Sequence, residues 1–387
     1  MKIIYFTTAL QKEDYIAFCE NWNGSLNTTI QNLHNRLIRS LALTHEVEVI
    51  SVRPYSRQYC RAKKLPAFVT QEGKITWHYL EVRRRKLFRD VFIKNQAKKI
   101  LLKTNLNDAI ILTDTLNPYI LKASTYLAEF FNLPIIGVCN NTPSGIANTG
   151  KSYTTNLHAM ADNLSGYITQ TSSLNLLFNK HNRANITIEG VLEEKYKVQD
   201  VTEYGKYIFY YGNLEEKYGV YDLIQAFIEL NNQDVNLVVA GYHANIDKMN
   251  KLSEFRNNIK FLGMISSDLT LSLENNSLFN INSRPYSEDY DRYLIPYNTL
   301  DYLNSKSLTV SVRNNILLKY FKDDALWLEL GEKEELIDVM NKALKMNEKE
   351  KAEMIKKANL DANKLYSMTV VNRKLVLFLK QFLKQKE

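Results

Sequence analysis

The feature that most constrains the fold is an apolar strand that ends at a glycine and leads into a helix. The run Tyr207–Tyr211 is followed by Gly212 and Asn213, then by Lys217, and a helical pattern starts near Tyr221. A strand that stops at a glycine allows backbone N–H groups and a helix N-terminus to approach a phosphate. Since Lys217 supplies the opposite charge, the pattern predicts a site for a nucleotide diphosphate.

The same strand-and-glycine pattern occurs twice more in the next fifty residues. Val235–Ala240 ends at Gly241, and Ile259–Leu262 ends at Gly263. Each motif alone is weak, because glycines follow strands in many α/β proteins. Their order is more specific, and it continues with Ser283-Arg284-Pro285 and with a proline, Pro296, five residues before the acidic Asp301.

Taken together, these features resemble the C-terminal half of the retaining glycosyltransferases of the group-one family. The resemblance implies the GT-B fold, in which two Rossmann-like α/β domains face each other across a cleft. It also implies transfer of a sugar from a nucleotide-diphosphate sugar, with a UDP-sugar favoured, to a glycan or lipid-linked acceptor. We expect a role in bacterial surface polysaccharide or glycoprotein assembly, with no metal and no cofactor besides the donor substrate.

The length and the strand pattern favour two domains. A chain of 387 residues is too long for one ordinary core. Apolar runs in the first half suit parallel strands covered by helices, namely Ile3–Thr7, Val47–Val52, Ala109–Thr113, Ile135–Cys139 and Tyr167–Gln170. Residues 186–205 are expected to be a polar connection. We therefore expect an acceptor-side domain at 1–195 and a donor-binding domain at 196–367, and the resemblance adds residues 368–387 to the first.

Lys217 is the main candidate for stabilising the departing diphosphate, and Gly212, Gly241 and Gly263 are expected to lie around the donor. A lysine and helix-terminal N–H groups can do this without a metal, through preorganised electrostatics. Family members usually have an arginine where this chain has Asn213, which carries no charge. Possible substitutes are Arg284, Arg292 and His243.

The resemblance also places a pair of glutamates, with seven residues between them, near the donor sugar and the ribose. The second corresponds to Asp301, whose carboxylate can accept bonds from ribose hydroxyls. The first corresponds to Tyr293, which removes a carboxylate. Between them, a lysine found in one subgroup is replaced by Asn298, whereas the proline is kept. The expected donor-binding residues of this segment are Tyr293, Pro296, Asn298, Thr299 and Asp301.

On the N-terminal side, two places are candidates for contact with the acceptor. Gly24 and Ser25 lie before a helix, where the family has a flexible glycine loop; an ordinary turn explains them equally well. Asp114 follows the run Ala109–Thr113, and we expect it to act in catalysis by orienting an acceptor hydroxyl. Capping of the next helix is the alternative for Asp114.

A net charge of +8 favours anionic partners. The basic segment at residues 81–94 is expected to contact an anionic membrane, unless it is a solvated helix flank. Nucleic acid is not expected, because the sequence lacks the motifs of nucleic-acid-binding folds. With no long apolar run and three widely spaced cysteines, the chain is expected to be cytoplasmic, with the inner membrane face as the alternative location. The histidine spacing predicts no metal site.

A second hypothesis comes from the three departures from the family pattern. Asn213, Tyr293 and Asn298 are compatible with a glycosyltransferase-like subunit that binds or stabilises an active partner without turnover. Lys217 and Asp301 favour the enzyme. A sugar-nucleotide epimerase of similar architecture is a third hypothesis, which the lack of the expected carboxylate and histidine set disfavours.

Overall fold

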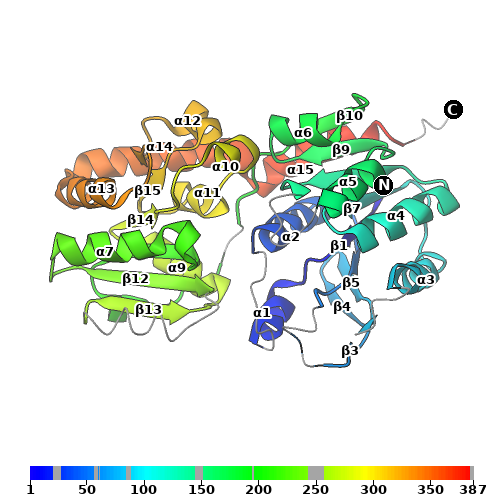
Figure 1. Ribbon diagram of the computed structural model, residues 1–387, viewed down its shortest axis with the longest axis horizontal. Helices are drawn as coiled ribbons and strands as arrows, with labels where there is room; N and C mark the ends of the chain where they lie inside the picture. The colour runs from blue at the N-terminus through cyan, green and yellow to red at the C-terminus, as the bar shows by residue number, and fades with distance from the viewer. Residues whose placement is uncertain are drawn as a thin grey trace. The chain divides into compact units, whose positions relative to one another are not determined.

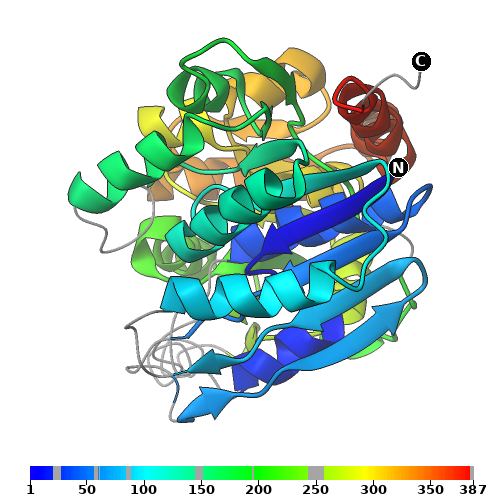
Figure 2. The same ribbon diagram turned by 90° about the vertical axis from the view of Figure 1, so that its right-hand side faces the viewer.

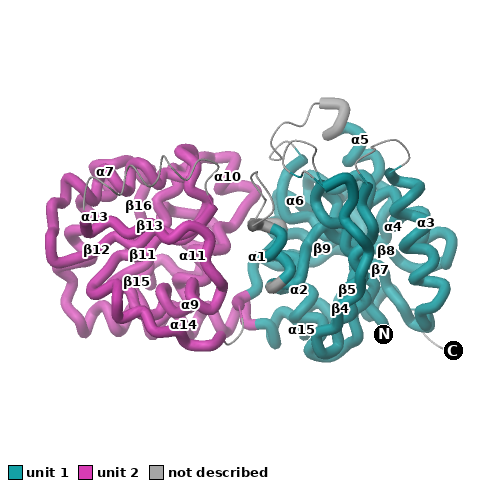
Figure 3. The backbone as a smooth tube through the Cα atoms, turned by 90° about the horizontal axis from the view of Figure 1, so that it is seen from below, with its two compact units in different colours: residues 1–191, 368–387 teal, residues 192–367 magenta. Residues whose placement is uncertain are grey.

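The chain forms two compact units in the computed structural model (Figure 1, Figure 3). Unit 1 comprises Met1–Val191 and Met368–Glu387, and unit 2 comprises Leu192–Ser367. The structure describes residues 1–20, 28–55, 60, 62–83, 89–143, 151–193, 196–242 and 257–383. Both units combine parallel strands with helices, so the expected α/β fold class is confirmed.

Unit 1 is built on a sheet of eight strands within the described residues. Its strands are β1 (Lys2–Thr7), β2 (Val47–Ser51), β4 (Phe68–Glu72), β5 (Ile75–Tyr79), β7 (Ala109–Asp114), β8 (Ile135–Cys139), β9 (Gly166–Thr169) and β10 (Ala184–Thr187). The order across the sheet is β10-β9-β8-β7-β1-β2-β5-β4, and β4 alone of these eight runs antiparallel to its neighbour. Two short strands, β3 (Lys64–Leu65) and β6 (Val82–Arg83), form a separate antiparallel pair.

The helices of unit 1 cover this sheet (Figure 2). They are α1 (Lys12–Glu20), α2 (Thr28–Ala42), α3 (Arg89–Leu101), α4 (Pro118–Phe131), α5 (Lys151–Ala161), α6 (Ser172–Phe178) and α15 (Met368–Lys380). The strands β1 and β7 are buried on both faces, as their continuous apolar sequences require. The last helix, α15, packs on α2, where the Asn372 amide donates to the Ser40 carbonyl at 2.7 Å.

Unit 2 has a six-stranded parallel sheet in the part of the chain that is described. Its strands are β11 (Tyr207–Asn213), β12 (Asn236–Tyr242), β13 (Ile259–Gly263), β14 (Phe279–Asn282), β15 (Leu308–Val312) and β16 (Leu326–Leu328). Its helices are α7 (Val220–Leu230), α9 (Ser267–Asn276), α10 (Glu288–Tyr293), α11 (Tyr297–Leu303), α12 (Asn315–Phe321), α13 (Lys333–Lys345) and α14 (Glu348–Tyr366), with 3₁₀ turns η2 (Thr202–Tyr204) and η3 (Glu216–Tyr218).

Alternate side chains of β11 serve two different cores. Ile208 and Tyr210 pack with α7 and α13 on one face of the sheet. Tyr207 and Phe209 point to the other face and pack with Leu273 of α9. Because successive residues of a strand point to opposite faces, a strand with helices on both sides must be apolar throughout.

The expected polar connection at 186–205 is wrong in part. β10 extends to Thr187, and Ile188, Val191 and Leu192 are buried. The Leu192 N–H donates to the Tyr366 carbonyl at 2.9 Å, so the chain is already part of the packed structure of unit 2 at this point. The buried apolar residues of this segment are few and irregularly spaced. The polar residues between them therefore dominate the sequence pattern and made the segment look like a linker.

Gly241 is required by the close approach of two strands, which gives a first test. Its φ is +142°, and a Cβ there would lie 1.7 Å from the Gly212 carbonyl oxygen. We expect Gly241→Ala to lower the free energy of unfolding by at least about 2 kcal/mol, because clash and backbone strain add. Chemical denaturation measures this change.

Gly73 provides the matched control, because its φ is +56° and a Cβ added there would have nothing within 4 Å. Gly73→Ala should cost only about 1–2 kcal/mol, the penalty of the left-handed conformation. Equal losses in the two variants would contradict the close-approach argument.

Candidate functional site

The strand order of unit 2 reverses at β11, which lies between β12 and β14. The chain thus passes from β11 to β12 on one side and returns to β14 on the other. In open parallel sheets, ligands bind outside the carboxyl ends of the strands at such a switch point. Here those ends are Gly212 and Asn213 of β11 and Ser283 and Arg284 after β14, which we call the unit 2 switch point.

Glycines bring the loops of the unit 2 switch point together. Gly219 has φ +73°, and a Cβ there would lie 2.0 Å from the Ser283 carbonyl oxygen. The loop after β11 therefore packs directly on the chain that follows β14. Gly241 has the corresponding contact with Gly212 described above. Gly263 ends β13, which is separated from β11 by β12.

Asn213 is the last residue of β11, and Lys217 lies in the turn η3 between β11 and α7. The Lys217 ammonium is 3.1 Å from the Glu215 carboxylate, and its side chain is 63% exposed. The Asn213 side-chain oxygen accepts from the Glu215 N–H at 3.0 Å. Asn213 thus shapes the turn that presents Glu215 and Lys217. The ammonium is accessible to an anionic ligand, although a carboxylate holds it in this structure.

Arg284 is the second cation at the unit 2 switch point. Its guanidinium carbon is 3.4 Å from the centre of the Tyr290 ring and 4.8 Å from that of Tyr218. Burial raises the pKa of the Tyr290 hydroxyl, and the Arg284 charge opposes this rise. The rings of Tyr218 and Tyr290 orient the Arg284 guanidinium. Of the other proposed substitutes, Arg292 is exposed on α10, and His243 lies outside the described residues.

The N-terminus of α11 is attached to the end of β11. The Tyr302 hydroxyl accepts from the Tyr211 N–H at 2.9 Å, and the Asn298 amide donates to the Tyr211 carbonyl at 3.4 Å. Pro296 is the N-cap residue and is buried, and no side chain caps the helix. The Asn298 contact brings the first turn of α11 to the unit 2 switch point, and the Tyr302 contact attaches the last turn of α11 to the same strand.

Thr299 is enclosed by polar side chains beneath α11. Its hydroxyl is 2.9 Å from that of Ser311 and accepts from the Asn282 amide at 2.9 Å, and the residue is 0% exposed. Its side chain thus links α11 to β14 and β15, which is a structural role. Asp301 lies in α11 and Tyr293 ends α10, and both are partly exposed.

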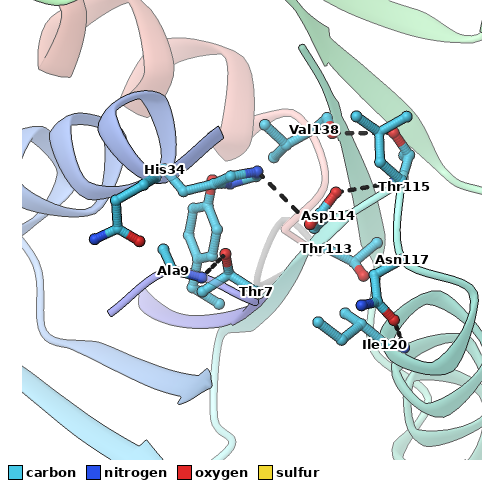
Figure 4. Close-up of polar contacts among 12 residues, drawn as sticks. Thr7, Ala9, His34, Thr113, Asp114, Thr115, Asn117, Ile120 and Val138 are labelled. Carbon is cyan, nitrogen blue, oxygen red and sulfur yellow. Dashed lines mark hydrogen bonds and ion pairs between the residues drawn. The ribbon is translucent and has the colours of Figure 1, made fainter. Parts of the chain in front are cut away.

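The sheet of unit 1 has a switch point of its own, with β1 between β2 and β7. Asp114 lies at the carboxyl end of β7, and Figure 4 shows its carboxylate facing His34 of α2. The His34 Nε2 is 3.9 Å from Asp114 Oδ2, and His34 Nδ1 is 2.7 Å from the Tyr5 hydroxyl. Neither His34 nor Asp114 is more than 1% exposed.

Burial determines how this pair titrates. It raises the pKa of the Asp114 carboxyl, against the opposing effects of His34 and the Leu116 N–H. It lowers the pKa of the His34 imidazole, against the charge of Asp114. The Asp114 Oδ1 accepts from the Leu116 N–H at 2.8 Å, which fixes the loop after β7. The capping alternative for Asp114 is wrong, because Asn117 caps α4 by accepting from the N–H groups of Tyr119 and Ile120.

Some predicted positions lie outside the residues that the structure describes. Gly24 and Ser25, and residues 84–88 of the basic segment, are outside the described residues. Within the described part of the chain, no group of three or more histidine, cysteine, aspartate or glutamate side chains is arranged to hold a metal ion. No helix within the same ranges has the length and apolar character needed to cross a bilayer.

One site residue, His34, was missed by the spacing arguments. His34 lies on the buried face of α2 beside Leu33 and Leu37, where an apolar stripe made it look like part of the core. Only the fold brings it to Asp114. Arg284 was among the predicted substitutes, but its contact with the Tyr218 ring likewise depends on the fold, because the two residues are distant in sequence.

The His34 environment gives a pH test. In the folded protein the pKa of the His34 imidazole lies below the ordinary 6.5. The stability that the neutral His34 contributes is therefore fully present above pH 6.5 and is lost as the pH falls below it, because the unfolded chain binds the proton first. His34→Gln should therefore show a smaller drop in Tm than the wild type between about pH 7 and about pH 5. Differential scanning calorimetry across this range measures the slope. His181→Gln, an exposed control, should behave like the wild type; an unchanged slope in His34→Gln would contradict the assignment.

Comparison with known proteins supports the fold and the family. Three solved structures cover almost the whole chain. Sucrose-phosphate synthase from Thermosynechococcus elongatus has a TM-score of 0.69 at 12% identity, covering 98% of this chain and 99% of its own. A trehalose-6-phosphate synthase, described in a study of glycosyltransfer with retention, has a TM-score of 0.68 at 11% identity, covering 99% and 100%. Anabaena HepE in complex with UDP has a TM-score of 0.66 at 11% identity, covering 98% and 100%.

No curated protein sequence matches the chain. The sequence model of the family described as glycosyl transferases group 1 matches residues 193–361, which span nearly all of unit 2. This match contains the glycine-ended strands, Lys217, and the segment from Ser283 to Asp301 on which the resemblance was based, so the predicted resemblance is confirmed. Residues 193–361 therefore resemble the glycosyl transferases group 1 family, and the chain has the GT-B fold with its two Rossmann-like units.

Proposed function

We propose that this protein is a retaining glycosyltransferase that uses a nucleotide-diphosphate sugar, with UDP as the favoured nucleotide. The observation that carries the proposal is the convergence, at the unit 2 switch point, of Lys217, Arg284 and the first turn of α11. The family match of residues 193–361 supports the reaction class. The UDP in the HepE structure supports the choice of nucleotide, and the trehalose-6-phosphate synthase study supports retention.

The chemistry assigned to unit 2 is electrostatic. As the bond from the sugar to the diphosphate breaks, negative charge grows on the phosphate oxygens, and fixed cations nearby lower the barrier. Lys217 must leave Glu215 to bind the diphosphate. An exposed ion pair of this kind is worth about 0–1 kcal/mol, so this exchange costs little. No metal is required in this mechanism.

Arg284 takes the role of the arginine that the family usually has at the position of Asn213. Two tyrosine rings already hold its guanidinium, so less side-chain entropy is lost when it binds a phosphate. Asp301 binds the ribose hydroxyls, and Tyr293 and Asn298 contact the donor from α10 and α11. The departing phosphate assists deprotonation of the acceptor on the same face of the sugar.

Unit 1 supplies the acceptor side in this proposal. In place of the expected orienting of an acceptor hydroxyl, we assign Asp114 the role of holding the loop after β7, because it is 1% exposed and accepts from the Leu116 N–H. Gly24 and Ser25 complete the acceptor side. The acceptor is a glycan or a lipid-linked sugar, in surface polysaccharide or glycoprotein assembly at the inner face of the membrane.

The second candidate function is a glycosyltransferase-like subunit without turnover. It is favoured by the replacement of three family residues by Asn213, Tyr293 and Asn298, and by the ion pair that occupies Lys217 in this structure. The two functions differ in one measurable property, which is the release of nucleotide from a donor.

Lys217→Ala tests the enzyme directly. The protein should release UDP from at least one sugar nucleotide in a panel, and the variant should lose about 10²-fold in kcat, because a charge at the leaving group is removed. Lys260→Ala, an exposed lysine of β13, is the matched control and should retain full activity. Absence of both donor binding and release across the panel would favour the non-catalytic subunit.

Arg284→Ala tests the second cation. The variant should bind UDP about 10- to 100-fold more weakly, as expected for the loss of a charged hydrogen bond. Arg284→Lys should recover only part of this affinity, because lysine lacks the planar group that stacks on Tyr290. Isothermal titration calorimetry measures the affinity, and Tm reports on the fold. A loss of Tm with unchanged UDP affinity would assign Arg284 a structural role.

A further inference from the structure

Helices α3 and α4 of unit 1 lie side by side and present a common outer surface (Figure 1, Figure 2). The buried side chains of α3 are Ile93, Ala97 and Leu101, which face the core. The opposite stripe of α3 and the exposed stripe of α4 together form what we call the α3–α4 surface. Its residues do not belong to either switch point.

Large apolar side chains are unusually exposed on the α3–α4 surface. Val91 is 41% exposed, Leu102 63%, Tyr126 40% and Phe130 49%. Val91 lies in the first turn of α3, and Leu102 directly follows its last residue. On α4, Tyr126 and Phe130 are one turn apart, with their rings 6.2 Å apart and stacked. A group of exposed apolar side chains on adjacent helices indicates an interaction surface, whereas a single one requires no explanation.

Lysines of α3 lie over the aromatic rings of α4. The Lys94 ammonium is 4.2 Å from the centre of the Tyr126 ring, and that of Lys98 is 3.6 Å from the centre of the Phe130 ring. These contacts keep cationic groups directly beside exposed rings. An aromatic ring can contact apolar groups while the ammonium beside it contacts anionic ones. Such pairs are therefore suited to an interface that contains both kinds of group.

The charge of the α3–α4 surface is predominantly positive. Asp90 and Glu129 are the carboxylates in residues 89–103 and 118–132, and the Lys122 ammonium pairs with Asp90 at 2.5 Å. Six side chains in the same ranges are cationic, namely Arg89, Lys94, Lys98, Lys99, Lys103 and Lys122. The excess of cations complements an anionic partner.

We propose that the α3–α4 surface docks on an anionic lipid bilayer. Tyrosine and phenylalanine rings enter the headgroup region, and the flanking ammonium groups contact lipid phosphates. Basic residues near an anionic membrane each strengthen binding by roughly fivefold, so the charges of α3 account for most of the affinity. With so few apolar side chains, binding is reversible and weakens as salt screens the charges. The proposed contact shares residues 89–94 with the expected segment 81–94 and extends along the rest of α3 and onto α4.

The proposal is tested by co-sedimentation of the complete chain with vesicles. Wild-type protein should bind vesicles of equal parts phosphatidylglycerol and phosphatidylcholine, and bind pure phosphatidylcholine at least about tenfold more weakly. The double variant Lys94→Glu with Lys98→Glu should lose at least about tenfold of the binding to the anionic vesicles. The side chains of Lys94 and Lys98 reach the surface, so their substitution should leave the fold intact. An unchanged Tm of the double variant verifies this.

A charge-matched control separates this surface from net charge. Lys349→Glu with Lys356→Glu changes two exposed lysines of α14 in unit 2 and should leave vesicle binding within about twofold of wild type. Phe130→Ala should reduce binding severalfold without altering the charge. Equal losses in the two lysine pairs, or no binding of the wild type to anionic vesicles, would overturn the proposal. So would retention of vesicle binding in Lys94→Glu with Lys98→Glu.

Discussion

The reversal of strand order at β11 is the constraint on which the donor side depends. Because β12 and β14 lie on opposite sides of β11, the connections that follow them leave the sheet in opposite directions and expose its carboxyl edge there. The loop after β11 can contact the chain after β14 only because Gly219 has no Cβ. The same arrangement at β1 brings Asp114 to the corresponding edge of unit 1. Each unit therefore builds its candidate site from the topology of its own sheet.

Buried polar contacts make the donor side rigid. The Thr299 hydroxyl joins Asn282 and Ser311, and the Tyr302 hydroxyl is bonded to the backbone of Tyr211. The side chains of Thr299, Asn282, Ser311 and Tyr302 are buried, so a substitution that leaves one of their polar groups unpaired would cost about 1–3 kcal/mol. Such a framework is expected where a site works by preorganised charge, because the cations must be in position before charge develops. The same buried contacts explain how Asn213, Tyr293 and Asn298 can replace family residues at the border of the site while the fold is kept.

The parts of the fold with buried strands could be predicted from the sequence, and the exposed or polar parts could not. β8 occupies the predicted run Ile135–Cys139, since burial on both faces leaves an unbroken apolar sequence. The strand β4 is exposed, and β14 carries buried asparagines, so neither has that signal. In the candidate site, Lys217 and Asn298 could be proposed from the sequence, because the order of motifs along the chain identifies their positions. The His34–Asp114 pair and the contact of Arg284 with the Tyr218 ring join segments that are distant in sequence, and no spacing rule predicts them.

The central claim is that a diphosphate binds at the carboxyl ends of β11 and β14, held by Lys217. A crystal structure of the protein soaked with UDP tests it most directly. The account predicts that the Lys217 ammonium leaves Glu215 and lies within hydrogen-bonding distance of a phosphate oxygen, with the ribose beside Asp301. UDP bound elsewhere, or bound while Lys217 remains paired with Glu215, would contradict it.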